Sequence, residues 1–370
     1  MEINNNNNSA KVLAFYLPQF CPNEFNDKWY GKGFTEWTNV GRAKPLFRGH
    51  CQPRVPADLG YYDLRVPSVY EQQVELAREA NVYGFAYWHY WWNGEMLLNE
   101  PAERMLCSQK TDFPFIFAWA NESWYKKLWS NNKSDDILIM EQTYPGEEDN
   151  RAHFDYCLPF FKDKRYITFD GRPVFLIYRP MHFKGVSSFM KQWNSLIKAS
   201  GVADSFYFIG MEYRNDELES LKSLGFDGVS PQHTLRTPMG WYTKAEHVRS
   251  LWMDLKDRLL GQLRCMDYSK YYKTIWNEDI DSREDVIPQI IPCWDNTPRA
   301  GRKGLIYKNA TPANFEKAAN VLMKGIQSKH NKLVFLKSWN EWAEGNYMEP
   351  DLQYGHAFIK ALAQAIDSNK

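Results

Sequence analysis

The sequence predicts an α/β fold, a (β/α)₈ barrel of the triosephosphate isomerase type with long βα loops. Three observations lead to this prediction: short apolar runs recur about eight times along 370 residues, amphipathic segments lie between most of them, and the runs are continuous rather than alternating. Continuous apolar runs are typical of strands buried on both faces of a parallel sheet. Strands that alternate with helices indicate an α/β architecture, and this chain length suits one barrel with long loops.

The predicted strands are rich in β-branched and aromatic residues. They cover residues 12–18, 83–90, 114–120, 173–178, 206–211, 226–231, 289–294 and 333–339. Apolar residues at helical spacing predict helices over 67–80, 186–200, 215–225, 311–328 and 354–366. Thr311 and Pro312 are a favourable N-cap and first-turn pair for the helix over 311–328. Gly201 is expected to end the helix over 186–200.

The predicted domain organisation is a disordered Asn-rich tail over 1–10 and a single catalytic barrel over 11–370. After the first strand, Pro18 and Gln19 lead into nearly fifty residues of predicted loop before the first helix. A helical insertion is expected over about 234–288, with its helix over 244–263. A doubly wound open sheet is the alternative, and it is disfavoured because no glycine-rich phosphate turn follows the first strand.

The charge balance favours neither nucleic acid nor an anionic membrane as a partner, because Lys plus Arg and Asp plus Glu both number 45. No stretch approaches the roughly 18 apolar residues of a membrane span. The N-terminal Asn run lacks the apolar region of a secretory signal, so a cytoplasmic location is expected. The six cysteines are scattered without ligand spacing, and we expect reduced thiols, no metal site and no cofactor. The sequence leaves the oligomeric state open.

Aromatic residues are abundant, with 15 Trp, 22 Tyr and 22 Phe, and many stand beside polar residues just after the predicted strands. Catalytic groups of such barrels lie at the carboxyl ends of the strands, and aromatic faces line partly apolar ligand sites. The candidate site residues share this position after a strand: Glu36, Trp37, His89, Tyr90, Trp91, Asn121, Glu122, Trp124, Arg179, Glu212, His233, Trp294, Asp295, Arg299, Trp339, Asn340, Glu341 and Glu344. Structural roles remain open for several of them, as ion partners, helix caps or buried histidines.

Glu341 and Glu344, in the segment 337–345, are the predicted catalytic pair. Residues three apart share one face if a helical turn begins at the first of them. Two close carboxyl groups walled by tryptophan should have their pKa values pushed apart. Breaking or making a glycosidic bond uses such a pair, one group as acid and one as base or nucleophile. A helix-start pair is the structural alternative, and Glu122 with Glu341 is an alternative catalytic pair.

Eight motifs resemble the WbsX-like glycosyltransferase family, whose domain is related to glycoside hydrolase family 99, the endo-α-mannosidase family. They lie at 14–20, 29–40, 44–50, 52–65, 84–94, 112–124, 294–299 and 338–351. The resemblance implies that Glu341 deprotonates the sugar 2-hydroxyl, which closes on the anomeric carbon to give a 1,2-anhydro sugar. It implies that Glu344 is the acid/base and that configuration is retained. Ala343 and 346–347 differ from the residues that family 99 commonly has, which affects subsite preference.

Three functions follow from these observations. The first is a retaining glycoside hydrolase or transglycosylase that acts on an oligo- or polysaccharide, and the resemblance points to a bacterial surface polysaccharide. The second is a glycosyltransferase of O-antigen or capsule biosynthesis with a nucleotide- or lipid-linked donor. Its only Asp-x-Asp tripeptide, 279–281, is weak support for a metal–diphosphate site. The third is an inactive carbohydrate-binding barrel, which the presence of both glutamates disfavours.

Overall fold

Parallel strands surround a central barrel in the computed structural model, which describes residues 1–3, 9–108, 110–127, 136–212, 217–231 and 263–370. The barrel strands, in chain order, are β2 (Lys11–Tyr16), β3 (Gly84–His89), β6 (Phe115–Trp119), β10 (Arg172–Ile177), β11 (Tyr207–Glu212), β12 (Gly228–Pro231), β14 (Gln289–Ile290) and β16 (Leu333–Leu336). Each strand pairs in parallel with its neighbour in sequence, except that β12 and β14 form no ladder, and β16 returns to pair with β2. Val229 bridges the remaining junction, since its N–H lies 2.7 Å from the Asp285 carbonyl and its carbonyl 2.8 Å from the Ile287 N–H. The predicted barrel is confirmed.

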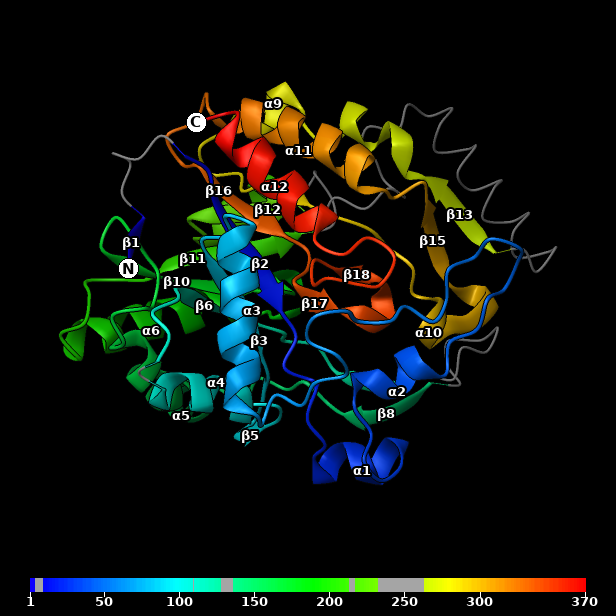
Figure 1. The fold of residues 1–370 in the computed structure, drawn as a ribbon. Coiled ribbons are helices and arrows are strands. Elements are labelled where there is room, and N and C mark those ends of the chain that lie inside the picture. Colours follow the sequence, from blue (N-terminus) through cyan, green and yellow to red (C-terminus); the bar gives the residue numbers. More distant parts are fainter. Residues whose placement is uncertain (4–8, 109, 128–135, 213–216, 232–262) are drawn as a thin grey trace.

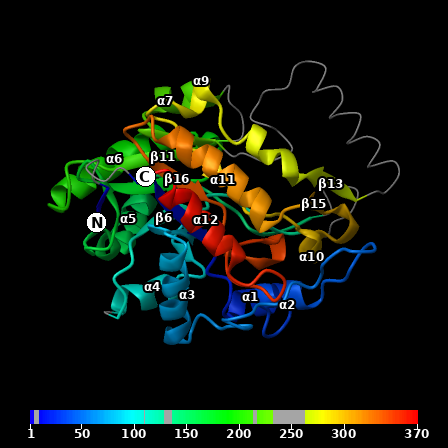
Figure 2. The same ribbon diagram turned by 45° about the horizontal axis from the view of Figure 1, so that its top comes forward.

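Helices cover the outside of these strands (Figure 1). Five of them match predicted helices: α3 (Pro67–Glu79), α6 (Val186–Ala199), α7 (Leu218–Leu224), α11 (Pro312–Ile326) and α12 (Ala357–Asp367). Figure 2 shows α11 and α12 lying side by side over the last strand. The predicted cap is confirmed, because the Thr311 side chain accepts the Asn314 N–H at 3.3 Å. Gly201 follows α6 with φ at 72°, the left-handed conformation that ends helices.

The helix α5 (Glu147–Phe161) and a set of shorter elements were not predicted. They are α1 (Glu24–Tyr30), α2 (Glu36–Gly41), α4 (Glu100–Cys107), α5 (Glu147–Phe161), α9 (Glu278–Asp281), α10 (Thr297–Ala300), β4 (Trp91–Trp92), β5 (Glu95–Met96), β7 (Trp124–Lys126), β8 (Ile137–Met140), β9 (Thr168–Phe169), β13 (Arg264–Asp267), β15 (Leu305–Lys308), β17 (Asn340–Glu341) and β18 (Asn346–Tyr347). The expectation of an unbroken loop after the first strand is therefore wrong, since α1 and α2 lie within it. The sequence did not predict α5 because this helix contains Pro159, and proline argues against a helix interior.

Two predicted segments lie largely outside the described residues. The helix expected over 244–263 falls on 232–262, and the described remainder of the insertion contains β13, the 3₁₀ helix Tyr268–Lys273 and α9. Of the predicted tail, residues 2–3 form β1 (Glu2–Ile3) beside β9. In the part of the chain that the structure describes, no helix combines the length and the apolar character needed to cross a bilayer.

Side chains alternate between the barrel interior and the surrounding helices. Phe15 stacks on Trp88 at 4.6 Å and on Phe335 at 5.0 Å inside the barrel. The next residue, Tyr16, faces the other way and donates a hydrogen bond to Gln73 of α3 at 2.7 Å. This two-residue period decides which residues at the strand ends reach the interior.

Gly325 of α11 is a packing constraint outside the site, because a Cβ there would overlap the indole ring of Trp276. We expect Gly325→Ala to lower the free energy of unfolding by about 1–3 kcal/mol in urea titrations, the usual cost of overpacking. Gly41→Ala is the control, since no atom lies within 4 Å of the added methyl group, and it should change stability by less than about 0.5 kcal/mol. Equal effects of the two substitutions would contradict this account of the helix contact.

Candidate active site

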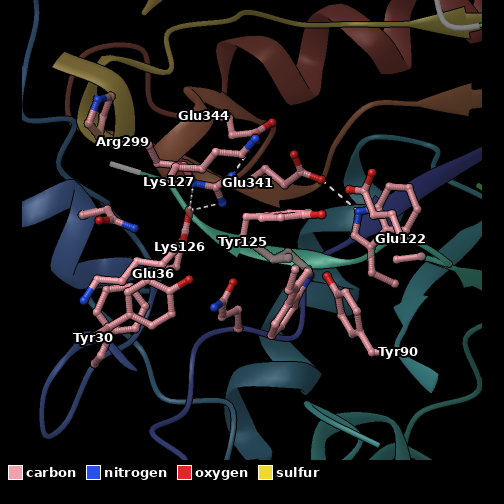
Figure 3. A pocket seen from close by; sticks show the side chains of 18 of the residues that line it. Tyr30, Glu36, Tyr90, Glu122, Tyr125, Lys126, Lys127, Arg299, Glu341 and Glu344 are labelled. Atoms are coloured by element: carbon pink, nitrogen blue, oxygen red, sulfur yellow. Dashed lines mark hydrogen bonds and ion pairs between the residues drawn. The ribbon is translucent and has the colours of Figure 1, made fainter. Parts of the chain in front are cut away.

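The loops at the carboxyl ends of the strands enclose a cavity of about 840 Å³ (Figure 3). The short elements α2, α10 and the 3₁₀ turn Trp342–Glu344 pack against one another around it. Eight of the predicted site residues line this cavity: Glu36, Tyr90, Glu122, Trp124, Trp294, Arg299, Glu341 and Glu344. The barrel therefore brings together side chains from five separate loops.

Asn340 fastens the last βα segment to the first strand. Its side chain is fully buried, accepts the Leu17 N–H at 2.7 Å and donates to the Leu17 carbonyl at 3.0 Å. The backbone N–H of Trp339 donates to the Phe15 carbonyl at 2.7 Å. Trp339 and Asn340 do not line the cavity. They hold the backbone so that the next residue, Glu341, faces it.

A tight turn places the two predicted catalytic carboxyl groups side by side. Glu341 ends β17, and the 3₁₀ turn Trp342–Glu344 follows it before β18 returns antiparallel. Residues three apart eclipse each other in 3₁₀ geometry, so the predicted shared face is present in a tighter form. Gly345 completes the turn at φ 57°, and a Cβ there would lie 2.7 Å from the Asp295 backbone nitrogen. The absence of a side chain at this glycine lets the loop that carries Arg299 approach.

Arg299 is the counter-charge of this cluster. Its guanidinium lies 2.5 Å from Glu344 through Nη1 and bonds Glu36 through both Nε and Nη2. Glu36 is buried with 2% of its side chain exposed, whereas Glu344 keeps 20% exposed. A buried carboxylate requires such a partner, because an isolated charge loses its hydration without compensation. The ion pairs therefore stabilise Glu36 and Glu344 as anions.

Glu341 differs from its neighbour in charge. Burial and the nearby Glu344 carboxylate raise the pKa of Glu341 to about 8, and its Oε1 accepts the indole N–H of Trp88 at 2.9 Å. Burial raises the pKa of Glu344 as well, but the Arg299 guanidinium and a hydrogen bond from Glu341 outweigh it and hold that pKa below the ordinary value. Near neutral pH the pair therefore shares one proton, which resides on Glu341.

Asp295 shapes the loop of Arg299 but does not line the cavity. It is buried and accepts hydrogen bonds from His50 at 2.8 Å and Gln52 at 2.7 Å. Burial raises the pKa of Asp295, and the hydrogen bonds from His50, Thr297 and Gln52 lower it below the ordinary value. Its backbone N–H donates to the Glu344 carbonyl at 2.8 Å, which fixes one loop against the other.

Asn121 and Arg179 hold the ends of two barrel strands together and do not line the cavity. The Asn121 side chain bonds the Arg179 N–H at 2.7 Å and its carbonyl at 3.0 Å, and so joins the ends of β6 and β10. The Arg179 guanidinium lies 3.3 Å from Glu122, which does line the cavity. Glu122 keeps 41% of its side chain exposed.

His89 and Trp91 face the helices rather than the cavity. Their neighbours Trp88 and Tyr90 line the cavity, and the strand period turns His89 to the opposite side. His89 Nε2 lies 2.8 Å from His153 Nε2 of α5, and Trp91 stacks on the same His153 at 4.8 Å. Burial lowers the pKa of His89 to about 3, so the imidazole is neutral. Trp37 likewise packs on Tyr62 and Trp342.

Two candidates have no described side chain in the site. Glu212 ends β11, but its side chain lies outside the described part, and so does the whole of His233. One further group resembles a metal-ligand set among the described residues: His89, His153 and Cys157 lie within 4.8 Å of one another. The two imidazoles already form a hydrogen bond with each other. A tetrahedral ion bound between them would break that hydrogen bond.

The sequence prediction missed several cavity residues. Trp88, Tyr178 and Lys337 line it at the ends of β3, β10 and β16. The two-residue period of the strands could have predicted them, because each is two residues beyond an interior position of its own strand. Lys126 and Lys127 come from β7 and the residue after it, and Arg42 follows α2. No strand period points to those three, because their position depends on loops that fold back over the barrel mouth.

Glu349 forms a second layer behind the turn. It is buried and accepts hydrogen bonds from Trp342 Nε1 at 2.6 Å, Gln73 at 2.6 Å and the Tyr62 hydroxyl at 3.0 Å. Burial raises the pKa of Glu349 to about 7. Trp342 stacks on Tyr347 at 3.8 Å, so the two rings and the carboxyl group support the turn from the side away from the cavity.

Comparison with known proteins bears out the resemblance of the motifs. The family model described as Glycosyltransferase WbsX matches residues 12–362. WxcX of Xanthomonas campestris, described as uncharacterized, is 33% identical over 374 residues, which cover 96% of this chain and 50% of WxcX. The chain thus spans half the length of the curated relatives it matches.

Solved structures share the fold at low sequence identity. The glycoside hydrolase family 99 endo-α-mannosidase from Bacteroides thetaiotaomicron has a TM-score of 0.58 at 15% identity, with 96% of each chain covered. A glycoside hydrolase-like protein has a TM-score of 0.58 at 14% identity, with 97% of this chain and 94% of its own covered. These similarities support the barrel as the common architecture.

The proton on Glu341 has a consequence for stability. Its pKa is 4.5 ordinarily and about 8 in the folded protein, so between these values the folded state binds a proton that the unfolded state lacks. The contribution of this group is fully present below pH 4.5 and is lost as pH rises toward 8. Glutamine does not titrate, so we expect the melting temperature of Glu341→Gln to rise relative to the parent between pH 5 and pH 8.5. A constant difference across this range would contradict the protonated state of Glu341.

Proposed function

The chain belongs to the family described as Glycosyltransferase WbsX, and from this premise we propose that it is a retaining carbohydrate-active enzyme that cleaves or transfers a glycosidic bond. The proposed reacting groups are Glu341 and Glu344, and the proposed substrate is an oligo- or polysaccharide of the bacterial surface. One observation carries the proposal: Glu341 and Glu344 lie side by side at the wall of a cavity of about 840 Å³, the first bonded by the Trp88 indole and the second paired with Arg299.

The cavity suits sugar residues in size and lining. Ligand sites of about 300–1,000 Å³ hold small molecules, and aromatic faces with a few polar groups fix their orientation. Trp88, Tyr90, Trp124 and Trp294 present aromatic rings to this cavity. Such rings stack on the apolar faces of sugars, while carboxyl and amide groups bond the hydroxyls.

The pair can perform the two proton transfers that the reaction needs. In the proposed first step the acid protonates the glycosidic oxygen and the base takes the proton of the sugar 2-hydroxyl. O2 forms a bond to the anomeric carbon as the bond to the leaving group breaks. In the second step water or a sugar hydroxyl gives its proton to the former acid and attacks that carbon, while O2 regains a proton from the former base. Two inversions retain the configuration.

The charges of Glu341 and Glu344 before the reaction indicate which of them is the acid and which is the base. The family 99 resemblance makes Glu341 the base and Glu344 the acid. The protonated state of Glu341 and the ion pair of Glu344 with Arg299 support the reverse assignment, with Glu341 as acid and Glu344 as base. The two assignments differ only in which of the two hydrogen-bonded glutamates carries the proton before the reaction. We propose the assignment that the resting charges favour.

A glycosyltransferase is the second candidate, because the family description names that activity and cationic side chains lie in the same cavity. The same pair would act in both enzymes, and the donor would differ. An inactive binding barrel has less support, since a pair that shares a proton serves no need of sugar binding alone.

Turnover assays test the function. Parent enzyme incubated with purified bacterial surface polysaccharides should give new reducing ends or transfer products of retained configuration, measured by NMR. We expect Glu341→Gln and Glu344→Gln to lower kcat by about 10²-fold or more, as loss of an acid or base does. Glu122→Gln, in the same cavity, should lose less than about tenfold. Full activity of Glu344→Gln with an inactive Glu122→Gln would identify the alternative pair instead.

A glycosyl fluoride of the sugar that the enzyme releases tests the roles, because fluoride departs without general-acid help. Glu341→Gln should recover most of its lost rate on this substrate, by about tenfold or more, whereas Glu344→Gln should remain inactive. Recovery by Glu344→Gln alone would instead support the roles that the family resemblance implies.

A further inference from the structure

Three cationic side chains from two separate segments line the cavity. They are Arg42, after α2, and Lys126 and Lys127, from the strand β7 and its end. We call these three residues the basic edge. Tyr30, Phe34 and Tyr125 line the cavity beside them, and the Lys126 ammonium lies 5.9 Å from the centre of the Tyr30 ring. Figure 3 shows Lys126 and Tyr30 toward the opposite side of the cavity from Glu122 and Tyr90.

The basic edge is poorly neutralised by the protein. Within the described ranges, the recorded ion pairs join neither Arg42 nor Lys126 to a carboxylate: Arg42 donates to Asn39 at 2.6 Å and Lys126 to the Trp29 carbonyl at 2.7 Å. Lys127 lies 3.6 Å from Asp136 and keeps 57% of its side chain exposed. The nearby Glu36 carboxylate is occupied by Arg299.

The excess of positive charge is local. Over the whole chain the two signs balance at 45 each. The described cavity lining holds five cationic side chains and four carboxyl groups, and Glu341 among these keeps its proton near neutral pH. A local excess of one sign of charge attracts ligands of the other sign. Neutral sugars supply no charge that would balance three gathered cations.

We propose that the basic edge binds an anionic group of the substrate, a carboxylate or a phosphate, so that the enzyme acts on an acidic carbohydrate. The proposal rests on the function proposed above and names the class of its substrate. Lysine and arginine bind both kinds of oxyanion through charge-assisted hydrogen bonds, and the adjacent aromatic rings offer faces for the sugar that carries the group. A uronic acid of a polymer and the diphosphate of an activated donor share this chemistry.

Matched probes separate the two sources. One arm uses acidic bacterial polysaccharides and the same polymers after chemical reduction of their carboxyl groups. The other arm uses UDP-glucose and inorganic pyrophosphate, with binding followed by calorimetry at 20 and 300 mM NaCl. We expect at least one anionic probe to be bound or turned over at least about tenfold better than its neutral counterpart, with the preference falling at high salt because exposed charges are screened.

Variants locate the effect. Arg42→Gln and Lys127→Gln should each reduce the preference for the anionic probe, measured as the ratio of its kcat/KM or affinity to that of the neutral probe, by about fivefold. Lys28→Gln is the control, since Lys28 is exposed on the nearby α1 but does not line the cavity, and it should behave as the parent does. Lys126 is left intact, because its bond to the Trp29 carbonyl also holds α1.

The outcomes keep the two proposals apart. Equal handling of the acidic and reduced polymers, together with no salt-sensitive binding of UDP-glucose or pyrophosphate, would overturn the anionic substrate. So would a preference that survives in the double variant Arg42→Gln/Lys127→Gln. The proposed function would stand in either case if Glu341→Gln and Glu344→Gln abolish turnover. It would fall, with the basic edge still a binding site, if those variants bind anionic probes and turn over substrate as the parent does.

Discussion

The bond of Arg299 to both Glu36 and Glu344 is the interaction on which the site depends. It joins three loops that are far apart in the sequence and gives two carboxylates a charge partner inside the protein. A buried carboxylate without such a partner would lose its hydration without compensation. Because Arg299 forms an ion pair with Glu344, whereas Glu341 accepts the Trp88 indole N–H, it also contributes to the difference between two glutamates that are three residues apart.

The shape of the cavity follows from how the last segment is held. Asn340 bonds the backbone of Leu17, Gly345 lets the loop that carries Asp295 approach, and Glu349 accepts a hydrogen bond from Trp342 on the side away from the cavity. These contacts lie away from the cavity, yet they fix the backbone between Glu341 and Glu344. The proposed catalytic pair needs this support, since proton transfer depends on positions held within a fraction of an ångström. The tryptophans of the segment thus serve mainly as supports, and Trp88, Trp124 and Trp294 supply the indole walls.

The charged groups that line the cavity fall into two sets that differ in burial. The carboxyl pair and Arg299 lie where the strands end, in a buried setting that tunes proton affinity. Arg42, Lys126 and Lys127 line the same cavity from loops, and Arg42 and Lys127 are exposed, so water screens their charges. Burial strengthens electrostatic effects, so the inner groups suit chemistry and the outer groups suit attraction and orientation. Both sets are parts of one cavity.

The sequence by itself determined the eight strands, five of the covering helices and the cluster of polar and aromatic residues at the strand ends, because apolar runs and helical periodicity are local signals. It also predicted that Glu341 and Glu344 lie together as a pair, since their spacing within one segment is local, and both line the cavity. It could not tell that His89 faces α5 while Trp88 bonds Glu341, because the phase of a strand is set by its neighbours in the barrel. Nor could it pair Arg299 with Glu36, or gather Arg42 with two lysines from β7. Those decisions belong to the tertiary structure, because closure of the barrel brings distant loops to one rim and the balance of burial and charge there depends on all of them together.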